Sequence, residues 1–258
     1  MRNAQRLDDA VTRRLDEATL GVLGLLATSN VVANSVLHDD WYVPWNLAVT
    51  AAGVGLATQR GGLTAAELGL GQSDLGAGVR VGAAAAAVIG TAVALATAHP
   101  TSRQAFVDDR GRVDGRELAV RVLFRVPAGT ALLEEVAFRG ALPGLLEARR
   151  GWSHRRAVLV SSALFGVWHV LPSLSLNDTN RAMSGRLSGR SGQASAVLGS
   201  VATTFAAGLV FSWLRDLSGS VVAPIVTHSA INGAGHVAAW RVSSSHVPEG
   251  TGPPGEEP

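Results

Sequence analysis

The run from Glu134 to Arg139 (EEVAFR) places two carboxylates and a guanidinium inside a stretch that is otherwise apolar enough to cross a membrane. Each charge at the centre of a lipid-exposed helix costs roughly 2.5 to 3.5 kcal/mol, so three together would cost on the order of 8 to 10 kcal/mol. The chain can carry these charges only if they face a bundle interior or a hydrated cavity. The run therefore predicts helices packed around a polar interior.

The remaining sequence is typical of a membrane protein that crosses the bilayer several times. It is 47% hydrophobic and 16% charged, and its mean hydropathy is +0.23. The candidate spans are Ala18–Leu37, Trp45–Ala57, Val79–Ala98, Leu118–Leu146, Ala157–Leu171, Ala196–Leu214 and Ser220–Trp240. A full crossing needs roughly 20 apolar residues, so the second and fifth blocks are short. We expect an all-α, polytopic membrane bundle of about seven (six to eight) transmembrane helices around an internal cavity.

The apolar blocks consist mainly of Ala, Val, Leu and Gly, and only 5% of the residues are aromatic. Small residues at regular spacing let membrane helices approach closely, and Gly78 and Gly82 show this spacing. We therefore expect close helix contacts at these glycines.

The sequence divides into three parts. Residues 1–17 mix Arg with Asp before the first span, and a small excess of Arg on their side of the membrane favours a cytoplasmic N-terminal segment. Residues 18–240 are predicted to form the membrane helical domain, with a motif core at about 118–235. Residues 241–258 are rich in Pro, and we expect a disordered tail. The predicted location is the cytoplasmic membrane, as a multi-pass protein.

Two classes of function are excluded by composition. The chain has no Cys, which rules out disulfides, thiol nucleophiles and thiolate metal sites. Its net charge is only +2, and the basic residues sit in short loops beside apolar blocks. That distribution is typical of membrane topology signals and not of a nucleic-acid surface. We expect the bilayer, and no nucleic acid, as a partner.

Two further polar pairs interrupt apolar blocks: Phe165 with His169, and His228 with Asn232. The members of each pair are four residues apart, so on a helix they share one face about one turn apart. We expect Phe165 and its neighbour Trp168 to act in packing. The spacing predicts that each pair forms part of the wall of one site.

Helical spacing also distinguishes the two carboxylates of the run from Glu134 to Arg139. Glu135 and Arg139 are at positions i and i+4 and can pair along the helix, whereas Glu134 points about 100 degrees away. Glu134 is then the freer carboxylate. A free carboxylate in a poorly hydrated pocket is suited to the role of general base.

Together, the three pairs supply the groups needed to hydrolyse an amide without a Ser or Cys nucleophile. The requirements are an attacking water, a base that takes its proton, and donors aimed at the developing oxyanion. Two other interpretations remain open: a proton-coupled carrier in which buried Glu and His relay protons, and a non-catalytic membrane immunity or scaffold protein. His236 lies two turns beyond His228, and we expect it to lie away from the site.

The order and spacing of these motifs resemble the CAAX prenyl protease and bacteriocin-processing family of intramembrane proteases, also called CPBP or Abi proteins, and within it the type II CAAX endopeptidases. The family motifs are EExxxR, FxxxH and HxxxN, found here as Glu134-Glu135 with Arg139, Phe165 with His169, and His228 with Asn232. The likeness covers roughly residues 118–235.

The resemblance implies an intramembrane endopeptidase that cleaves a peptide bond of a prenylated or membrane-anchored protein or peptide. Carried over by position, Glu134 would activate the water with help from His169. His228 and Asn232 would hold the oxyanion, while the supporting residues would be Glu135, Arg139 and Phe165. Members are labelled metalloproteases, and a glutamate-dependent mechanism without metal has also been argued. If a divalent metal such as zinc is present, its ligands would be Glu134, His169 and His228; we favour no tightly bound metal.

Overall fold

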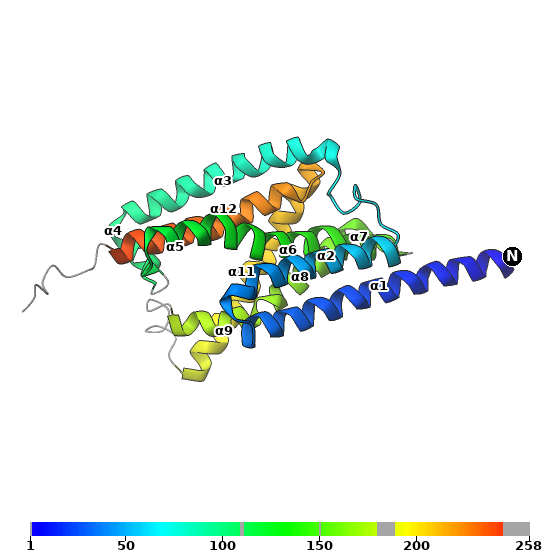
Figure 1. Cartoon of the computed structure of the whole chain (residues 1–258), viewed down its shortest axis with the longest axis horizontal. Helices are drawn as coiled ribbons and strands as arrows, with labels where there is room; N and C mark the ends of the chain where they lie inside the picture. Colours follow the sequence, from blue (N-terminus) through cyan, green and yellow to red (C-terminus); the bar gives the residue numbers. More distant parts are fainter. Residues whose placement is uncertain (1, 109–110, 150, 180–188, 245–258) are drawn as a thin grey trace, which may run out of the picture.

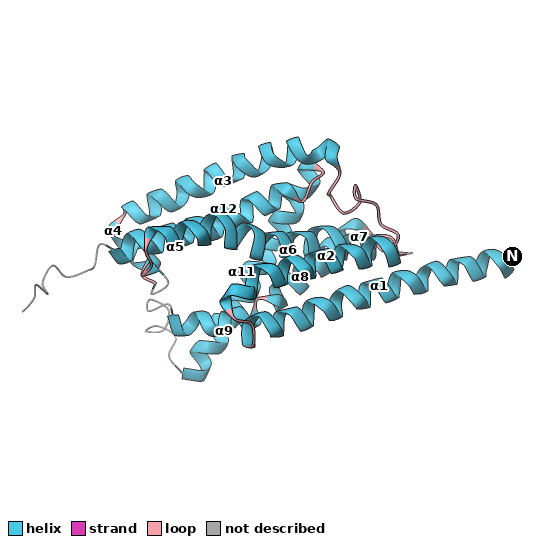
Figure 2. Cartoon of the chain, in the orientation of Figure 1, coloured by secondary structure: helices cyan, strands magenta, loops and turns pink. Residues whose placement is uncertain are grey.

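The computed structural model describes residues 2–108, 111–149, 151–179 and 189–244, and within these ranges it contains helices and turns but no strand (Figure 2). The all-α expectation is therefore confirmed. The main helices are α1 (Arg2–Ser35), α2 (Tyr42–Gly55), α3 (Leu75–Ala98), α8 (His154–Trp168), α9 (Val170–Thr179), α11 (Gly189–Ser218) and α12 (Val222–Ser244). Helices α1 and α2 lie side by side, as do α3 and α12 (Figure 1). Shorter helical turns are η1 (Asp39–Trp41), η2 (Leu56–Arg60), η3 (Gln72–Asp74), α4 (Pro100–Arg103) and η4 (Gln104–Phe106).

A continuous helical rod carries the charged run. It consists of α5 (Gly115–Val120), η6 (Arg121–Ala131), α6 (Leu132–Glu135), η7 (Val136–Ala141) and α7 (Leu142–Glu147). Both η6 and η7 are π-helical, a wider geometry that is rare and is frequently found at functional sites. Pro127 lies inside η6, where it removes a backbone N–H that a regular α-helix would use. The rod packs against both α2 and α12, which places it inside the bundle.

The three charges of the run are buried in this rod. The exposed fractions are 6% for Glu134, 0% for Glu135 and 2% for Arg139. None of the three can therefore contact lipid, as the cost of a lipid-exposed charge requires.

The expected spans coincide with helices, although their number is not confirmed. Among the described residues, four helices are long and apolar enough to cross a membrane: Asp9–Ser35, Gln72–Ala98, His154–Leu174 and Gly192–Ser218. The remaining three expected spans are the short α2, the charged rod and α12, whose interior carries Thr227, His228 and Asn232. A bundle of about seven spans is compatible with these helices, because a buried segment does not need a fully apolar surface.

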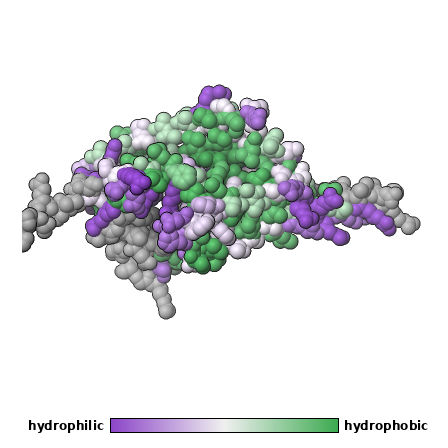
Figure 3. Space-filling model, in the orientation of Figure 1, coloured by the Kyte–Doolittle hydropathy of each residue, from purple (hydrophilic) through white to green (hydrophobic). Residues whose placement is uncertain are grey.

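The outer surface agrees with this assignment. Apolar side chains gather over the middle of the molecule, and hydrophilic ones lie toward the two ends of its longest axis and in a smaller group at the upper edge of this view (Figure 3). Exposed large apolar side chains include Leu20, Val88, Leu123 and Leu198. A surface of this kind suits a lipid environment.

The ends of the chain are described only in part. Helix α1 begins at Arg2, so the segment that we expected before the first span is helical and continuous with it. At the other end, α12 extends to Ser244, and residues 245–258 of the predicted tail lie outside the described residues. The assignment of residues 1–17 to the cytoplasmic side remains a prediction.

Helices α3 and α12 approach closely at the two glycines that the sequence singles out. A Cβ atom on Gly82 would lie 2.8 Å from Val226 Cβ and 2.9 Å from the carbonyl oxygen of Ala223. One on Gly78 would lie 2.9 Å from Val222 Cβ. These distances are too short for real Cβ contacts, so only glycine permits this approach.

We predict that Gly82→Ala lowers the free energy of unfolding by about 1–3 kcal/mol, because the added methyl overpacks a contact formed partly by rigid backbone. The matched control is Gly90→Ala on the same helix, where the new Cβ would have no atom within 4 Å apart from the neighbouring backbone of its own helix. Denaturation in detergent micelles would measure both variants. Equal stability of the two variants would contradict the close α3–α12 contact.

Candidate functional site

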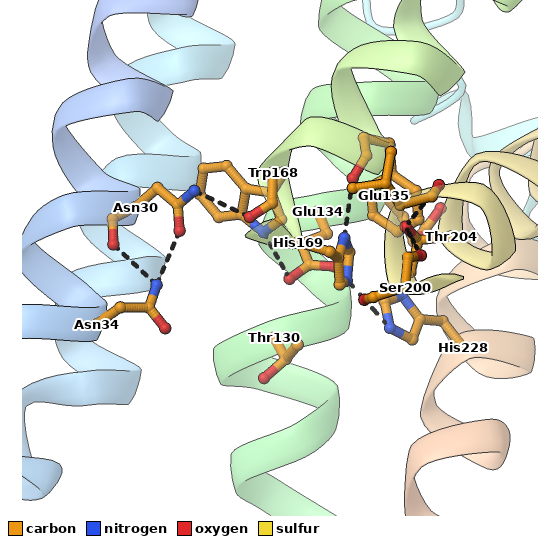
Figure 4. Close-up of polar contacts among 12 residues, drawn as sticks. Asn30, Asn34, Thr130, Glu134, Glu135, Trp168, His169, Ser200, Thr204 and His228 are labelled. Carbon is orange, nitrogen blue, oxygen red and sulfur yellow. Dashed lines mark hydrogen bonds and ion pairs between the residues drawn. The ribbon is translucent and has the colours of Figure 1, made fainter. Parts of the chain in front are cut away.

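The three sequence motifs converge from three separate helical segments (Figure 4). Glu134 lies at the end of α6, His169 follows the last residue of α8, and His228 lies in α12. The Oε2 atom of Glu134 is 3.8 Å from Nε2 of His169 and 3.9 Å from Nε2 of His228. The carboxylate therefore faces both imidazoles at once, although the three residues span almost a hundred positions of the chain.

These side chains line a cavity of about 730 Å³. Asn232 and Phe165 line the same cavity, so all three motifs contribute to one wall. Helices α1 and α2 add Asn34, Tyr42 and Asn46 to the lining. The site is therefore a pocket between helices, in which a few polar side chains project from a mostly apolar lining.

Each histidine is held through its Nδ1 atom by an acceptor. His169 Nδ1 lies 2.8 Å from the carbonyl oxygen of Phe165, and His228 Nδ1 lies 2.7 Å from Oε1 of Glu135. A carbonyl or carboxylate oxygen can only accept, so Nδ1 donates in both cases. This fixes the orientation of both rings and directs both Nε2 atoms toward Glu134.

Glu135 and Arg139 form the pair that their spacing predicts. Arg139 Nε and Oε2 of Glu135 form an ion pair at 3.0 Å, and both side chains are almost completely buried. The guanidinium carbon lies 4.0 Å from the ring centroid of Phe165 and 5.0 Å from that of Phe211. Glu135 thus joins Arg139 to His228, and the aromatic rings enclose the cation.

Phe165 and Phe211 also set the positions of the imidazoles. The ring of Phe165 meets His169 edge to face, with centroids 4.6 Å apart, and Phe211 stacks on His228 at 5.2 Å. Phe165 has the expected packing role. Phe211, on α11, was not among the predicted residues, because an isolated aromatic residue in an apolar helix gives no sequence signal.

Trp168 does more than pack, in contrast to our expectation. Its indole Nε1 donates to Oε1 of Glu134 at 3.0 Å (Figure 4). A signal was available in the sequence, since a tryptophan in an apolar block needs an acceptor for its N–H. The sequence could not identify that acceptor as a carboxylate on another helix.

The expectation for His236 was wrong. His236 lines the cavity together with His228 and Asn232. Residues at spacings of four along one helix lie on nearly the same face, so a third polar residue at this spacing extends the site along α12.

A second cavity, of about 280 Å³, reaches Arg139 but none of the other motif residues. Its lining includes His154, whose Nδ1 is 2.9 Å from Oε1 of Glu147 and whose Nε2 is 2.8 Å from Oδ2 of Asp216. Because Glu134, His169 and His228 line only the larger cavity, the larger cavity is the candidate site.

The side chains that would bind zinc lie farther apart than the ligands of a zinc ion. Among the residues that the structure describes, no group of three or more His, Cys, Asp or Glu could hold a metal ion. The ligands that would bind zinc if a metal were present are Glu134, His169 and His228, with the carboxylate 3.8 and 3.9 Å from the two imidazoles. Ligands at about 2.0–2.2 Å from a tetrahedral zinc lie only about 3.4 Å from one another.

Comparison with protein families gives one match. Residues 116–234 match the model of the Rce1-like family, described as type II CAAX prenyl endopeptidase Rce1-like. The matched range begins in α5 and ends in α12, and it contains all three motifs. Comparisons with curated proteins and with solved structures gave no match.

Proposed function

Residues 116–234 form a domain of the Rce1-like type II CAAX prenyl endopeptidase family, and from this premise we propose that the protein is an intramembrane endopeptidase. The family and the four apolar helices identify a membrane protein of a protease family. The proposed reaction is hydrolysis of a peptide bond in a prenylated or otherwise membrane-anchored protein. The proposed location is the cytoplasmic membrane.

The observation that supports this function best is the position of Glu134 Oε2. It has no hydrogen-bond partner among the described residues, and it faces Nε2 of His169 at 3.8 Å and Nε2 of His228 at 3.9 Å. These separations are too long for direct hydrogen bonds but short enough for one water to contact all three groups. A water in that position would touch a base and two orienting imidazoles.

In the proposed reaction, Glu134 takes a proton as the water oxygen attacks the carbonyl carbon of the scissile bond. His169 helps to orient this water, because its Nδ1 donates to Phe165 and its Nε2 is left to accept. The proton on Glu134 then passes to the amide nitrogen as the C–N bond breaks. One water is consumed and two chain ends are released.

His228 and Asn232 are the proposed oxyanion donors. They lie one turn apart on α12 and line the same cavity. In this role His228 carries protons on both ring nitrogens, and the Glu135 carboxylate faces that charge 2.7 Å from Nδ1. Donors fixed in a poorly hydrated site stabilise a developing oxyanion strongly.

A cleavage assay in liposomes tests this proposal. The purified protein is reconstituted with a membrane-anchored, prenylated reporter peptide, with and without a chelator. We expect cleavage in both samples, since the proposed mechanism uses no metal and no group of three or more His, Cys, Asp or Glu among the described residues is placed to hold one. Loss of cleavage with the chelator, restored by added zinc, would contradict the metal-free mechanism.

The same liposomes, together with an assay in cells, distinguish the protease from the two alternative functions. Proton-coupled flux in the absence of any proteolysis would favour a carrier. Cleavage products absent under all conditions, together with normal function in cells after joint replacement of Glu134, His169 and His228, would favour a non-catalytic partner. Either result would overturn the protease proposal.

A further inference from the structure

Trp168 contacts the proposed base directly. Its indole N–H donates to Oε1 of Glu134 at 3.0 Å, whereas Oε2 of the same carboxylate has no partner among the described residues. One oxygen is thus bound and the other points at the two imidazoles (Figure 4). The single donor distinguishes two oxygens that are otherwise chemically equivalent.

The backbone carbonyl of Trp168 accepts a hydrogen bond from another helix, and the sequence explains why it is available to do so. In a continuous helix, the carbonyl of Trp168 would receive the N–H of residue 172. That residue is Pro172, which has no N–H to donate. The carbonyl instead accepts Nδ2 of Asn30, on α1, at 2.9 Å.

The indole ring is also fixed from the side of the central rod. It meets Phe138, in η7, edge to face, with centroids 5.7 Å apart. Trp168 is therefore held by α1 at its backbone and by the rod at its ring. A donor fixed at both ends can hold a carboxylate in one orientation.

We propose that Trp168 is a positioning residue that holds the Glu134 carboxylate so that Oε2 faces His169 and His228. The proposal rests on the proposed peptidase function. Without the indole N–H, the carboxylate is free to rotate about its last torsion and toward direct contact with either imidazole, which would occupy the position needed by the water. A reacting group displaced by about 1 Å can cost about 10²-fold in rate.

The test compares the same substitution at two tryptophans. Trp168→Phe keeps an aromatic ring and removes the donor. Trp45→Phe is the matched control, because the Trp45 indole also donates between helices, to Ser29 Oγ at 3.0 Å, whereas the Glu134 carboxylate accepts from Trp168. A second variant replaces Trp168 with 3-benzothienylalanine, which keeps the size of the indole and lacks only the N–H.

We expect both changes at Trp168 to lower kcat by about 10–100-fold with KM within about twofold of the wild type. Trp45→Phe should leave kcat within about twofold. A tryptophan that only packs would tolerate the benzothienyl replacement. Unchanged kcat in that variant would therefore overturn the proposal.

A second measurement does not depend on cleavage. In detergent micelles, the ¹⁵N–¹H signal of the Trp168 indole is assigned by its loss in Trp168→Phe. We expect this signal to shift in Glu134→Leu, which removes the acceptor, while the Trp45 signal stays in place. If the signal does not shift, the Trp168–Glu134 bond is contradicted. If the signal shifts but the wild-type protein has no peptidase activity, the bond stands and only the proposed function is contradicted.

Discussion

Glu134→Gln is expected to lower kcat for cleavage of a membrane-anchored peptide by about 10³-fold, within the range of about 10²–10⁴ that a general base contributes. Glutamine keeps the shape of the side chain, and its carbonyl oxygen can still accept the indole N–H of Trp168, which is 3.0 Å from Oε1 in the wild type. What is lost is the ability to take a proton from water. The measurement is single-turnover and steady-state cleavage in liposomes.

The control for this substitution is Glu117→Gln on the same helical rod. Glu117 is exposed and pairs with Arg121 near the start of the rod. The Glu117→Gln variant should cleave the peptide at the wild-type rate. Both variants should insert and unfold like the wild type, because Glu134→Gln removes a buried charge without adding bulk. Full activity in Glu134→Gln would refute the assignment of Glu134 as the base.

Arg139→Met is expected to lower the free energy of unfolding by about 3–5 kcal/mol, the cost of breaking a buried ion pair on one side. Arg139 and Glu135 are 1% and 0% exposed and 3.0 Å apart. Once the guanidinium is removed, Glu135 keeps only His228 as a partner and is a buried carboxylate that has lost its arginine counter-charge. Denaturation in detergent micelles, followed by circular dichroism, would measure the loss.

Two further variants show whether the loss comes from the unpaired charge. Adding Glu135→Leu to Arg139→Met removes both charges, and we expect it to recover about 1–3 kcal/mol. Arg125→Met is the matched control on the same rod, because Arg125 pairs with the exposed Asp39 at 2.9 Å and such surface pairs are worth about 0–1 kcal/mol. A loss in Arg139→Met no larger than in Arg125→Met would contradict a structural role for the buried pair.

Local spacing explains why much of the site could be predicted from the sequence. The pairing of Glu135 with Arg139 follows from a four-residue separation on a helix, and the structure has it at 3.0 Å. The burial of the charges follows from the cost of exposing them to lipid. The first prediction depends only on the spacing of two residues on a helix. The second depends only on the cost of placing a charge in lipid. Both can be derived from the sequence without knowing how the helices pack. The catalytic roles of Glu134, His169, His228 and Asn232 remain predictions.

Contacts between distant segments could not be predicted in the same way. Trp168 was expected only to pack, and His236 was expected to lie away from the cavity, yet the first donates to Glu134 and the second lines the cavity. Asn30 and Phe211 gave no signal at all, because each acts through a residue far away in the chain. Such contacts depend on how helices rotate and cross, which no local pattern encodes.

The sequence by itself determined that this chain is a helical membrane protein with a polar interior, and which three motifs make up the candidate site, since apolar length, charge cost and helical spacing are all local properties. Only the tertiary structure decided that Glu134 faces both imidazoles, that Glu135 also contacts His228 on α12, and that Trp168 anchors one carboxylate oxygen. These contacts join residues on different helices, and their geometry exists only once the helices have packed against one another.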